Sequence, residues 1–573
     1  MHSTDLTGDR LACRVGDHGQ LIELRDLETG ASLLGQPGPL CLFEGVDGAA
    51  TATATHMGVR LNWTSLPGGA TATLHLTTAG PTLRLRLEAV GQSGECRVRF
   101  PFVDALRLSH DPQAPDRVYG GADGFRDGQG RPIFRRSAWP LPTARVAPDG
   151  RSLTFLPAPG ADVGLAEPYT LRLESDRPAV FEAELRLHGG GWPAAWALFR
   201  DRVRSLFDLS QYQRPEVAWY QDQFVQHFTF LYGREILNLE TGRLELDRFL
   251  DEAERDFGGY DGMLLWGVYP RLGIDERTQW DFYDDLPGGR EGLRDLSRRA
   301  RERGVRVFVP YKPWDRSAEL HGQPAPKDHE ELARLVADAE ADGIFLDTMS
   351  AISPEFRAAL DRARPGVVFC SEGRAKGKAF EVITGSWDQT SLTGVKQSNW
   401  SAPAEVMPGV DMWRFVFPEH RLFVTSRHAM GNDRIRLIQR GFFSGMGWVV
   451  WQDIFGLALP FTPEEAALLK RCRTIFREHK AALWSTAPTP LMETLVAGVF
   501  ANEFPATSRR LWTFYNETDR PVDGPVLKIE PRPHHRYVDL WANRELTPDE
   551  AGCLHLSLEP RSVGAVAELP EEA

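Results

Sequence analysis

Between residues 212 and 482, short apolar runs alternate with segments that carry apolar residues at helical spacing. Buried parallel strands consist of near-continuous apolar residues, because helices cover both faces of a parallel sheet. We interpret eight runs as such strands: 217–220, 262–266, 305–311, 343–347, 367–372, 382–387, 413–417 and 448–451. Eight buried strands alternating with helices over about 270 residues predict a (β/α)8 barrel.

Two of the intervening segments show the helical spacing clearly. One face is formed by Leu332, Leu335, Val336 and Ala339, and another by Leu468, Leu469, Cys472, Ile475 and Phe476. Apolar residues three and four positions apart lie on one side of an α-helix, which then packs on the barrel. The segments 388–412 and 418–431 are irregular, and we expect loops over the barrel mouth there.

The flanking regions have the patterns of sheets. Residues 1–190 contain segments with partly alternating apolar and polar residues, among them 71–77, 83–88 and 181–187, which indicate antiparallel strands. Residues 191–211 have helical spacing and predict a linker helix, and strands return in 483–573. The predicted fold class is therefore multidomain: an N-terminal antiparallel β-sandwich, a linker helix, a central TIM barrel (212–482) and a small C-terminal β-sandwich.

Composition, the N-terminus and the cysteines limit the partners and the location that we expect. The net charge of −13 disfavours nucleic acid and anionic membranes as partners. The N-terminus has no apolar signal segment, and no apolar run approaches the roughly 18 residues of a membrane span. The cysteines are scattered, with no pair at metal-site spacing, at 13, 41, 96, 370, 472 and 553. We expect a cytoplasmic protein with free thiols, no bound metal and no cofactor; its oligomeric state stays open.

Two carboxylates follow neighbouring predicted strands directly: Asp347 ends the run 343–347, and Glu372 ends the run 367–372. In a barrel, the carboxyl ends of the strands form the active face. Other polar and aromatic residues fall at the predicted strand ends, and for these we expect substrate binding: Trp266, Arg271, Lys312, Trp314, Asp315, Arg374, Trp387, Asp388, Trp451 and Asp453. Tyr220, Asp222, Gln223, Tyr311 and Gln389 also fall at predicted ends.

A strand-terminal Asp often caps the next helix instead of acting in catalysis. After Asp347, the segment 348–353 delays the next helix to about residue 353, which argues against capping. Glu is a poor N-cap, so a catalytic role for Glu372 is also favoured. Asp388 is an alternative second acid or a substrate-binding residue. Lys312 and Arg374 are expected to pair with these acids.

A pair of acids at neighbouring strand ends is the equipment for cleaving a glycosidic bond. One carboxylate stabilises or bonds to the oxocarbenium-like centre, and the other acid protonates the leaving oxygen. The first must stay ionised, which a nearby cation favours, and the second needs a raised pKa. We therefore predict that Asp347 is the nucleophile and Glu372 the acid/base, acting on a carbohydrate substrate.

Several motifs resemble those of α-glycoside hydrolases. The stretch 280–311 resembles the second-helix and third-strand region of the α-galactosidase superfamily, and Asp342-Gly-Ile-Phe-Leu-Asp347 resembles its strand-four nucleophile motif. A Glu on strand five is closer to endo-α-N-acetylgalactosaminidases and α-amylases. The segment 452–456 resembles a strand-eight motif of these proteins, with Gln-Asp where Glu-Asn is expected. The resemblance implies retaining hydrolysis of α-linked glycosides.

The sequence also departs from the α-galactosidase pattern. Phe345 stands where that pattern has a Lys, and its strand-six acid would fall near Asp388, which could then be the acid/base. A transglycosylase with the same acids and a carbohydrate-binding barrel without catalysis stay open as alternatives.

Overall fold

The computed structural model describes residues 3–571 except for the following positions: 47–49, 57, 104–105, 107–117, 120–124, 127–131, 135–142, 147–150, 158–168, 176, 268–277, 316–326, 376, 389–409, 427–432 and 453–458. The chain divides into two compact units, Met1–Leu206 and Phe207–Ala573.

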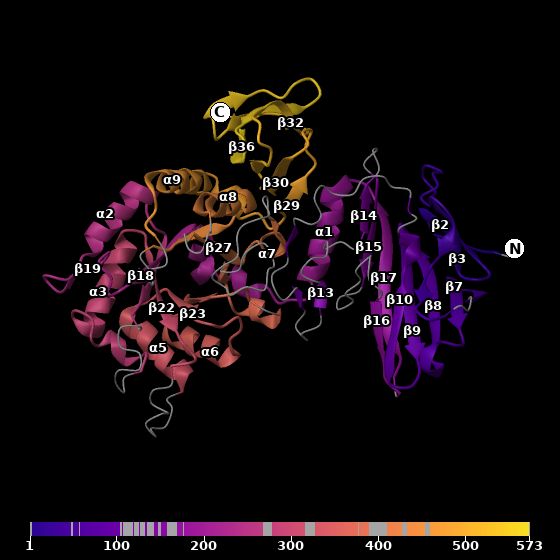
Figure 1. Cartoon of the computed structure of the whole chain (residues 1–573), viewed down its shortest axis with the longest axis horizontal. Coiled ribbons are helices and arrows are strands. Elements are labelled where there is room, and N and C mark those ends of the chain that lie inside the picture. Colours follow the sequence, from indigo (N-terminus) through magenta and orange to yellow (C-terminus); the bar gives the residue numbers. More distant parts are fainter. Residues whose placement is uncertain are drawn as a thin grey trace. The chain divides into compact units, whose positions relative to one another are not determined.

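A closed barrel of eight parallel strands forms the centre of the second unit (Figure 1). In barrel order its strands are β18 (Val225–Phe230), β21 (Gly262–Trp266), β22 (Arg306–Tyr311), β23 (Gly343–Leu346), β24 (Val368–Ser371), β25 (Gly385–Asp388), β27 (Arg421–Ser426) and β28 (Gly447–Val450). The predicted TIM barrel is therefore confirmed.

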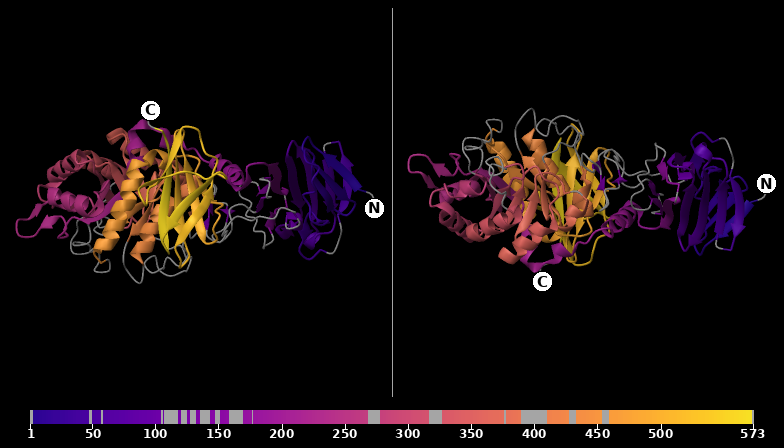
Figure 2. Two further views of the ribbon diagram at one scale, coloured as in Figure 1. Left: turned by 90° about the horizontal axis from the view of Figure 1, so that it is seen from above. Right: turned by 90° about the horizontal axis from the view of Figure 1, so that it is seen from below.

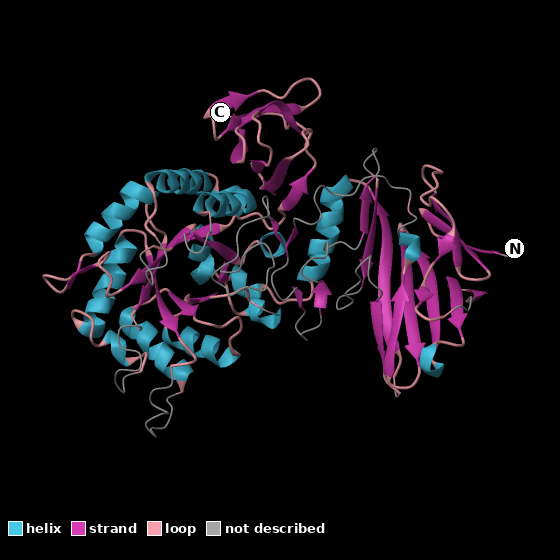
Figure 3. Cartoon of the chain, in the orientation of Figure 1, coloured by secondary structure: helices cyan, strands magenta, loops and turns pink. Residues whose placement is uncertain are grey.

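Helices surround these strands (Figure 3). They include α2 (Leu246–Phe257), α3 (Gly289–Glu302), α5 (Asp328–Ala339), α6 (Pro354–Ala363), α8 (Arg434–Ser444) and α9 (Pro463–Glu478). The predicted face of α5 is buried in full, and that of α9 is buried except for Leu468 at its edge. Helix α9 begins with a capping box between Thr462 and Glu465, which satisfies backbone N–H groups of its first turn.

The predicted first strand, 217–220, is wrong. This segment belongs to a 3-10 helix, η5 (Pro215–Asp222), whose Val217 and Tyr220 pack into the barrel interior. The first strand is β18. It was not predicted because its buried Gln226, His227 and Thr229 interrupt the apolar run that is expected of a core strand. Tyr220, Asp222 and Gln223 therefore precede β18 instead of following the first strand.

The predicted seventh strand, 413–417, is also wrong, because it forms the short helix α7 (Met412–Val416). Asp411 caps this helix by accepting a hydrogen bond from the backbone N–H of Trp413. The seventh strand is β27, which lies inside the segment 418–431 that we expected to be a loop. It begins with Arg421, whose buried guanidinium donates to the Gln223 carbonyl, and such a buried charge is not expected in a core strand.

The first unit consists mainly of antiparallel sheets. The largest contains β14 (Thr143–Val146), β15 (Ser152–Pro157), β17 (Ala179–His188), β9 (Thr82–Val90), β8 (Thr71–Ala79), β7 (Gly58–Trp63) and β6 (Thr51–Thr55). Smaller sheets contain β1 (Ser3–Thr7), β2 (Leu11–Gly16), β3 (Gln20–Asp26) and β4 (Gly38–Pro39), and β16 (Tyr169–Leu173), β10 (Gly94–Arg99) and β5 (Leu42–Phe43). Helix α1 (Gly191–Arg204), predicted as the linker, packs on β15 and β17.

A second antiparallel region ends the chain. Its larger sheet contains β29 (Thr489–Met492), β30 (Val499–Pro505), β31 (Arg510–Asn516), β36 (Ser562–Pro570), β33 (His535–Asp539) and β34 (Arg544–Leu546), and β32 (Val522–Lys528) pairs with β35 (Cys553–Leu558). Figure 2 shows this yellow sheet beside the orange helices of the barrel, where β30, β31 and β36 contact α8. The boundaries 190, 211 and 482 stay predictions.

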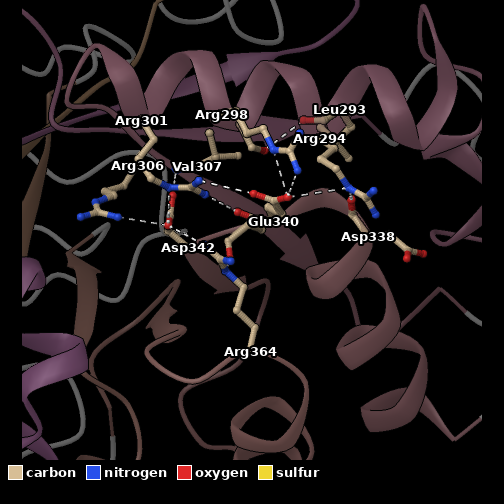
Figure 4. Close-up of polar contacts among 12 residues, drawn as sticks. Leu293, Arg294, Arg298, Arg301, Arg306, Val307, Asp338, Glu340, Asp342 and Arg364 are labelled. Atoms are coloured by element: carbon tan, nitrogen blue, oxygen red, sulfur yellow. Dashed lines mark hydrogen bonds and ion pairs between the residues drawn. The ribbon is translucent and has the colours of Figure 1, made fainter.

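Buried carboxylates fix the amino ends of the barrel strands. Asp342 precedes β23 and accepts a hydrogen bond from the backbone N–H of Val307 on β22 (3.1 Å). Figure 4 shows Arg301, Arg306 and Arg364 around the same carboxylate, at 3.3–3.4 Å. Asp261 before β21 likewise accepts from two N–H groups at the start of β18. These charges hold the barrel together at the end opposite the carboxyl ends of its strands.

Candidate active site

The alternation of side chains along a strand decides which residues face the barrel interior. Phe308 of β22, Phe345 of β23 and Cys370 of β24 belong to the apolar core inside the barrel. Residues an even number of positions further along each strand point the same way, and these are Lys312, Asp347 and Glu372. The register of the parallel strands aligns their carboxyl ends, since Leu346 pairs with both Tyr311 and Ser371. The strands therefore bring two carboxyl groups and an amine together.

The Asp347 carboxyl group is held by four neighbours. The indole Nε1 of Trp314 donates to its Oδ2 (2.7 Å), its side chain hydrogen-bonds that of Glu372, the charge of Lys312 attracts it, and the backbone of Thr348 hydrogen-bonds it. Burial raises the pKa of Asp347, while these four neighbours act to lower it. Two carboxyl groups in contact retain a proton between them more readily than two separate acids.

The residue after Asp347 has an unusual backbone. Thr348 has a φ of 58°, which β-branched residues rarely adopt. In this conformation its N–H donates to Oε2 of Glu372 (2.5 Å). The following helix, α6, begins only at Pro354 and has Ser353 as its N-cap, so Asp347 does not cap it, as predicted. A strained turn therefore orients the second carboxyl group against the first.

The predicted aromatic residues divide into two groups. Trp266, Trp387 and Trp451 are buried in the barrel interior, where Trp387 packs on Phe345 with ring centroids 4.3 Å apart. Trp314 instead keeps 38% of its surface exposed while its indole N–H binds Asp347. The three buried rings form an apolar floor under the carboxyl groups, and Trp314 offers an open ring face beside them.

Asp388 lies on the other side of the sheet. Its neighbour Trp387 faces the interior, so the Asp388 side chain points outward toward α8. There its Oδ2 accepts from Arg440 (2.7 Å) and Arg374 (2.9 Å), and Arg374 also binds Asp411. All four charged side chains are buried. This ion cluster joins the segment that follows Glu372 to the start of α7 and to α8.

Asp315 follows β22, and its charge acts on Lys312. Arg271, Gln389 and Asp453 lie outside the described residues. Four further residues of this region were not predicted from the sequence: Thr348, Gln279, Asp411 and Arg440. Gln279 donates to the Lys312 carbonyl (2.7 Å) and accepts from its N–H (2.9 Å), a contact without a sequence signal. The Asp at 411 before Met-Trp-Arg was a recognisable N-cap signal.

Within the described parts of the chain, no cluster of three or more His, Cys, Asp or Glu side chains could hold a metal ion. Over the same residues, no helix combines the length and the apolar character that crossing a membrane requires.

No protein-family model matches the sequence, and no curated protein matches it. Solved structures do match. An α-N-acetylgalactosaminidase from Bifidobacterium bifidum in complex with GalNAc has 13% identity, covers 89% of this chain and 98% of its own, and has a TM-score of 0.52. A GH36 α-galactosidase from Geobacillus stearothermophilus has 12% identity, covers 99% of this chain and 100% of its own, and has a TM-score of 0.45. The fold resemblance predicted from the sequence is thus confirmed.

Proposed function

We propose that this chain is a glycoside hydrolase that cleaves α-linked glycosides with Asp347 as nucleophile and Glu372 as acid/base. The contact between these two carboxyl groups at the carboxyl ends of adjacent barrel strands carries the proposal. Cleavage of a glycosidic bond by this mechanism requires one ionised and one protonated carboxyl group, which flank the bond. The proposed reaction uses water and side chains of this chain, without a cofactor.

The surroundings support this distribution of roles. The indole N–H of Trp314 and the ammonium of Lys312 both favour a negative charge on Asp347. Trp266, Trp387 and Trp451 keep the floor of the site apolar, which raises the cost of a second negative charge. Glu372 is therefore proposed to retain the proton that the leaving oxygen receives.

The same contact favours retention of configuration. Inverting enzymes need about 6.5–9.5 Å between the two carboxyl groups to hold a water molecule, whereas retaining enzymes need about 5–5.5 Å. The side chains of Asp347 and Glu372 interact directly, which is closer to the shorter of these two separations. We propose a glycosyl-enzyme intermediate on Asp347, which water then hydrolyses with Glu372 as base.

The substrate class follows from the neighbouring folds and from the open ring of Trp314. The similar structure from Bifidobacterium bifidum is an α-N-acetylgalactosaminidase. We propose an α-linked galactoside or N-acetylgalactosaminide, with one sugar face packed on the exposed indole of Trp314.

The roles are tested with pairs of substrates that differ only in the leaving group. Turnover of 4-nitrophenyl and methyl α-galactosides, α-N-acetylgalactosaminides and α-glucosides is measured, with the β-anomers as controls. Glu372→Ala should lower the turnover of the methyl glycoside by about 10²–10⁴-fold. It should lower that of the 4-nitrophenyl glycoside far less, because this activated leaving group needs no proton. Asp347→Ala should lose turnover of both. Asp251→Asn, an exposed substitution on α2, is the matched control.

Product analysis completes the test. ¹H NMR of the first sugar released should show the α-anomer, and product formed in the presence of a second sugar distinguishes hydrolysis from transglycosylation. Normal turnover by Asp347→Ala would overturn the proposal. A leaving-group dependence in Asp347→Ala instead of Glu372→Ala would exchange the two roles. Sugar binding without turnover by the wild type would favour the non-catalytic alternative.

A further inference from the structure

Lys312 is a buried lysine at the carboxyl end of β22. Its side chain is fully buried, and its Nζ lies 4.9 Å from the centre of the Trp266 ring. Nζ makes no hydrogen bond with any residue that the structure describes. Gln279 holds the Lys312 backbone by a donated and an accepted hydrogen bond, so the residue is fixed in place. A lysine held this way contributes charge, not hydrogen bonds to the protein.

Among the described residues, the charged groups that face Lys312 are acids. Asp347 approaches from the end of β23, and Asp315 from the segment after β22. Glu372, which follows β24, is hydrogen-bonded to Asp347. The other titratable groups of the interior, Cys370 and Tyr220, stay neutral because burial raises their pKa values. Burial lowers the pKa of Lys312 to about 7, against the opposing attraction of Asp315 and Asp347. The ammonium is therefore stable only while an adjacent carboxylate carries its countercharge.

Neutral N–H donors reach both carboxyl groups of the pair. Trp314 donates to Asp347, and the Thr348 backbone donates to Glu372 and also acts to lower the pKa of Asp347. Two adjacent carboxyl groups share one proton, and each donor favours the charged form of the group that it contacts. Lys312 differs from these donors because it brings a full positive charge, which acts on Asp347.

We propose that Lys312 is a positioning residue that acts through Asp347: its ammonium keeps the negative charge of the pair on Asp347 and the proton on Glu372, and loss of the ammonium switches the enzyme off in mildly alkaline solution. This inference rests on the proposed function. Lys312 has no exposed surface, so it acts on the carboxyl pair and not on the sugar. A lysine suits this switch because, unlike arginine, it loses its proton near neutral pH when buried.

The test compares Lys312→Met and Lys312→Arg with the wild type from pH 5 to 9.5. The probes are methyl α-galactoside and methyl α-N-acetylgalactosaminide, whose leaving group needs the proton of Glu372, in a stopped assay of the released sugar. The wild-type kcat/KM should fall above about pH 7. Lys312→Arg, which stays charged, should move this fall upward by at least one pH unit. Lys312→Met should lose at least tenfold in kcat with an unchanged KM, and should show no fall near pH 7.

Two outcomes overturn the inference. In the first, Lys312→Met keeps the wild-type rate and the alkaline fall in kcat/KM. In the second, kcat/KM of Lys312→Arg falls at the same pH as that of the wild type, which would assign the fall to Glu372. Thermal unfolding checks that each variant is folded, and the Met variant alone decides if arginine does not fit. Retained turnover in Asp347→Ala would remove the proposed function as a whole, whereas an inactive Asp347→Ala beside an unaltered Lys312→Met removes only this inference.

Discussion

Replacing Lys312 with Met should stabilise the protein although it impairs the proposed reaction. Lys312 is fully buried beside Trp266, and its Nζ makes no hydrogen bond to the described residues. Moving an ammonium from water into such surroundings costs free energy, which appears as a lowered pKa. Methionine has a similar length and volume without the charge, so it can occupy the same space.

The size of the effect follows from the pKa of Lys312, which burial lowers from 10.5 to about 7. At about 1.4 kcal/mol for each pKa unit, the buried charge costs about 5 kcal/mol. The folded protein binds fewer protons than the unfolded chain between about pH 7 and 10.5. The cost is therefore fully present below pH 7, falls to about 2 kcal/mol at pH 9, and disappears above 10.5.

Thermal unfolding of both proteins between pH 6 and 9.5 measures this cost. For a folding unit of about 370 residues, 5 kcal/mol corresponds to about 6 °C in Tm, and the gap at pH 9 should shrink to about 3 °C. Lys528→Met, an exposed substitution on β32, is the control and should show no pH-dependent gap. A Met variant that is less stable at pH 6, or a gap that does not change with pH, would refute the reasoning.

Three other substitutions and a pH–rate profile test the geometry. Thr348→Gly should raise the free energy of unfolding by about 1 kcal/mol without loss of kcat, because only its backbone N–H serves Glu372; Thr348→Ala keeps the strain and is the control. Asp388→Asn should lower stability by about 3–5 kcal/mol because it breaks a buried ion cluster, and any loss of turnover should not depend on the leaving group, unlike the loss expected of an acid/base. Asp342→Asn should lower the midpoint of urea unfolding while leaving kcat unchanged, since its contacts lie at the amino end of the barrel. Finally, pH–rate profiles should show activity lost on the acid side at a pH above the ordinary Asp pKa, because burial raises the pKa of Asp347; an acid limb at the ordinary value would contradict its burial.

The barrel was predictable because most of its strands are short, apolar and buried on both faces. β21 was predicted residue for residue, and β22 to β25 within a few residues. The first and seventh strands were not predictable, since β18 carries buried Gln226 and His227 and β27 begins with a buried arginine. Gln226 and Arg421 have partners far along the chain, Trp387 and Gln223, which a local pattern does not reveal.

The sequence alone placed Asp347 and Glu372 at neighbouring strand ends, because an acid that directly follows a buried apolar run lies at the end of the strand which that run forms. It could not separate Glu372 from Asp388, since both follow apolar runs. Only the folded barrel separated them: Glu372 lies two residues after an interior Cys370, whereas Asp388 follows an interior Trp387 and so points outward to Arg440. The physical reason is the two-residue period of a strand, whose phase is set by packing across the barrel and not by the order of the residues.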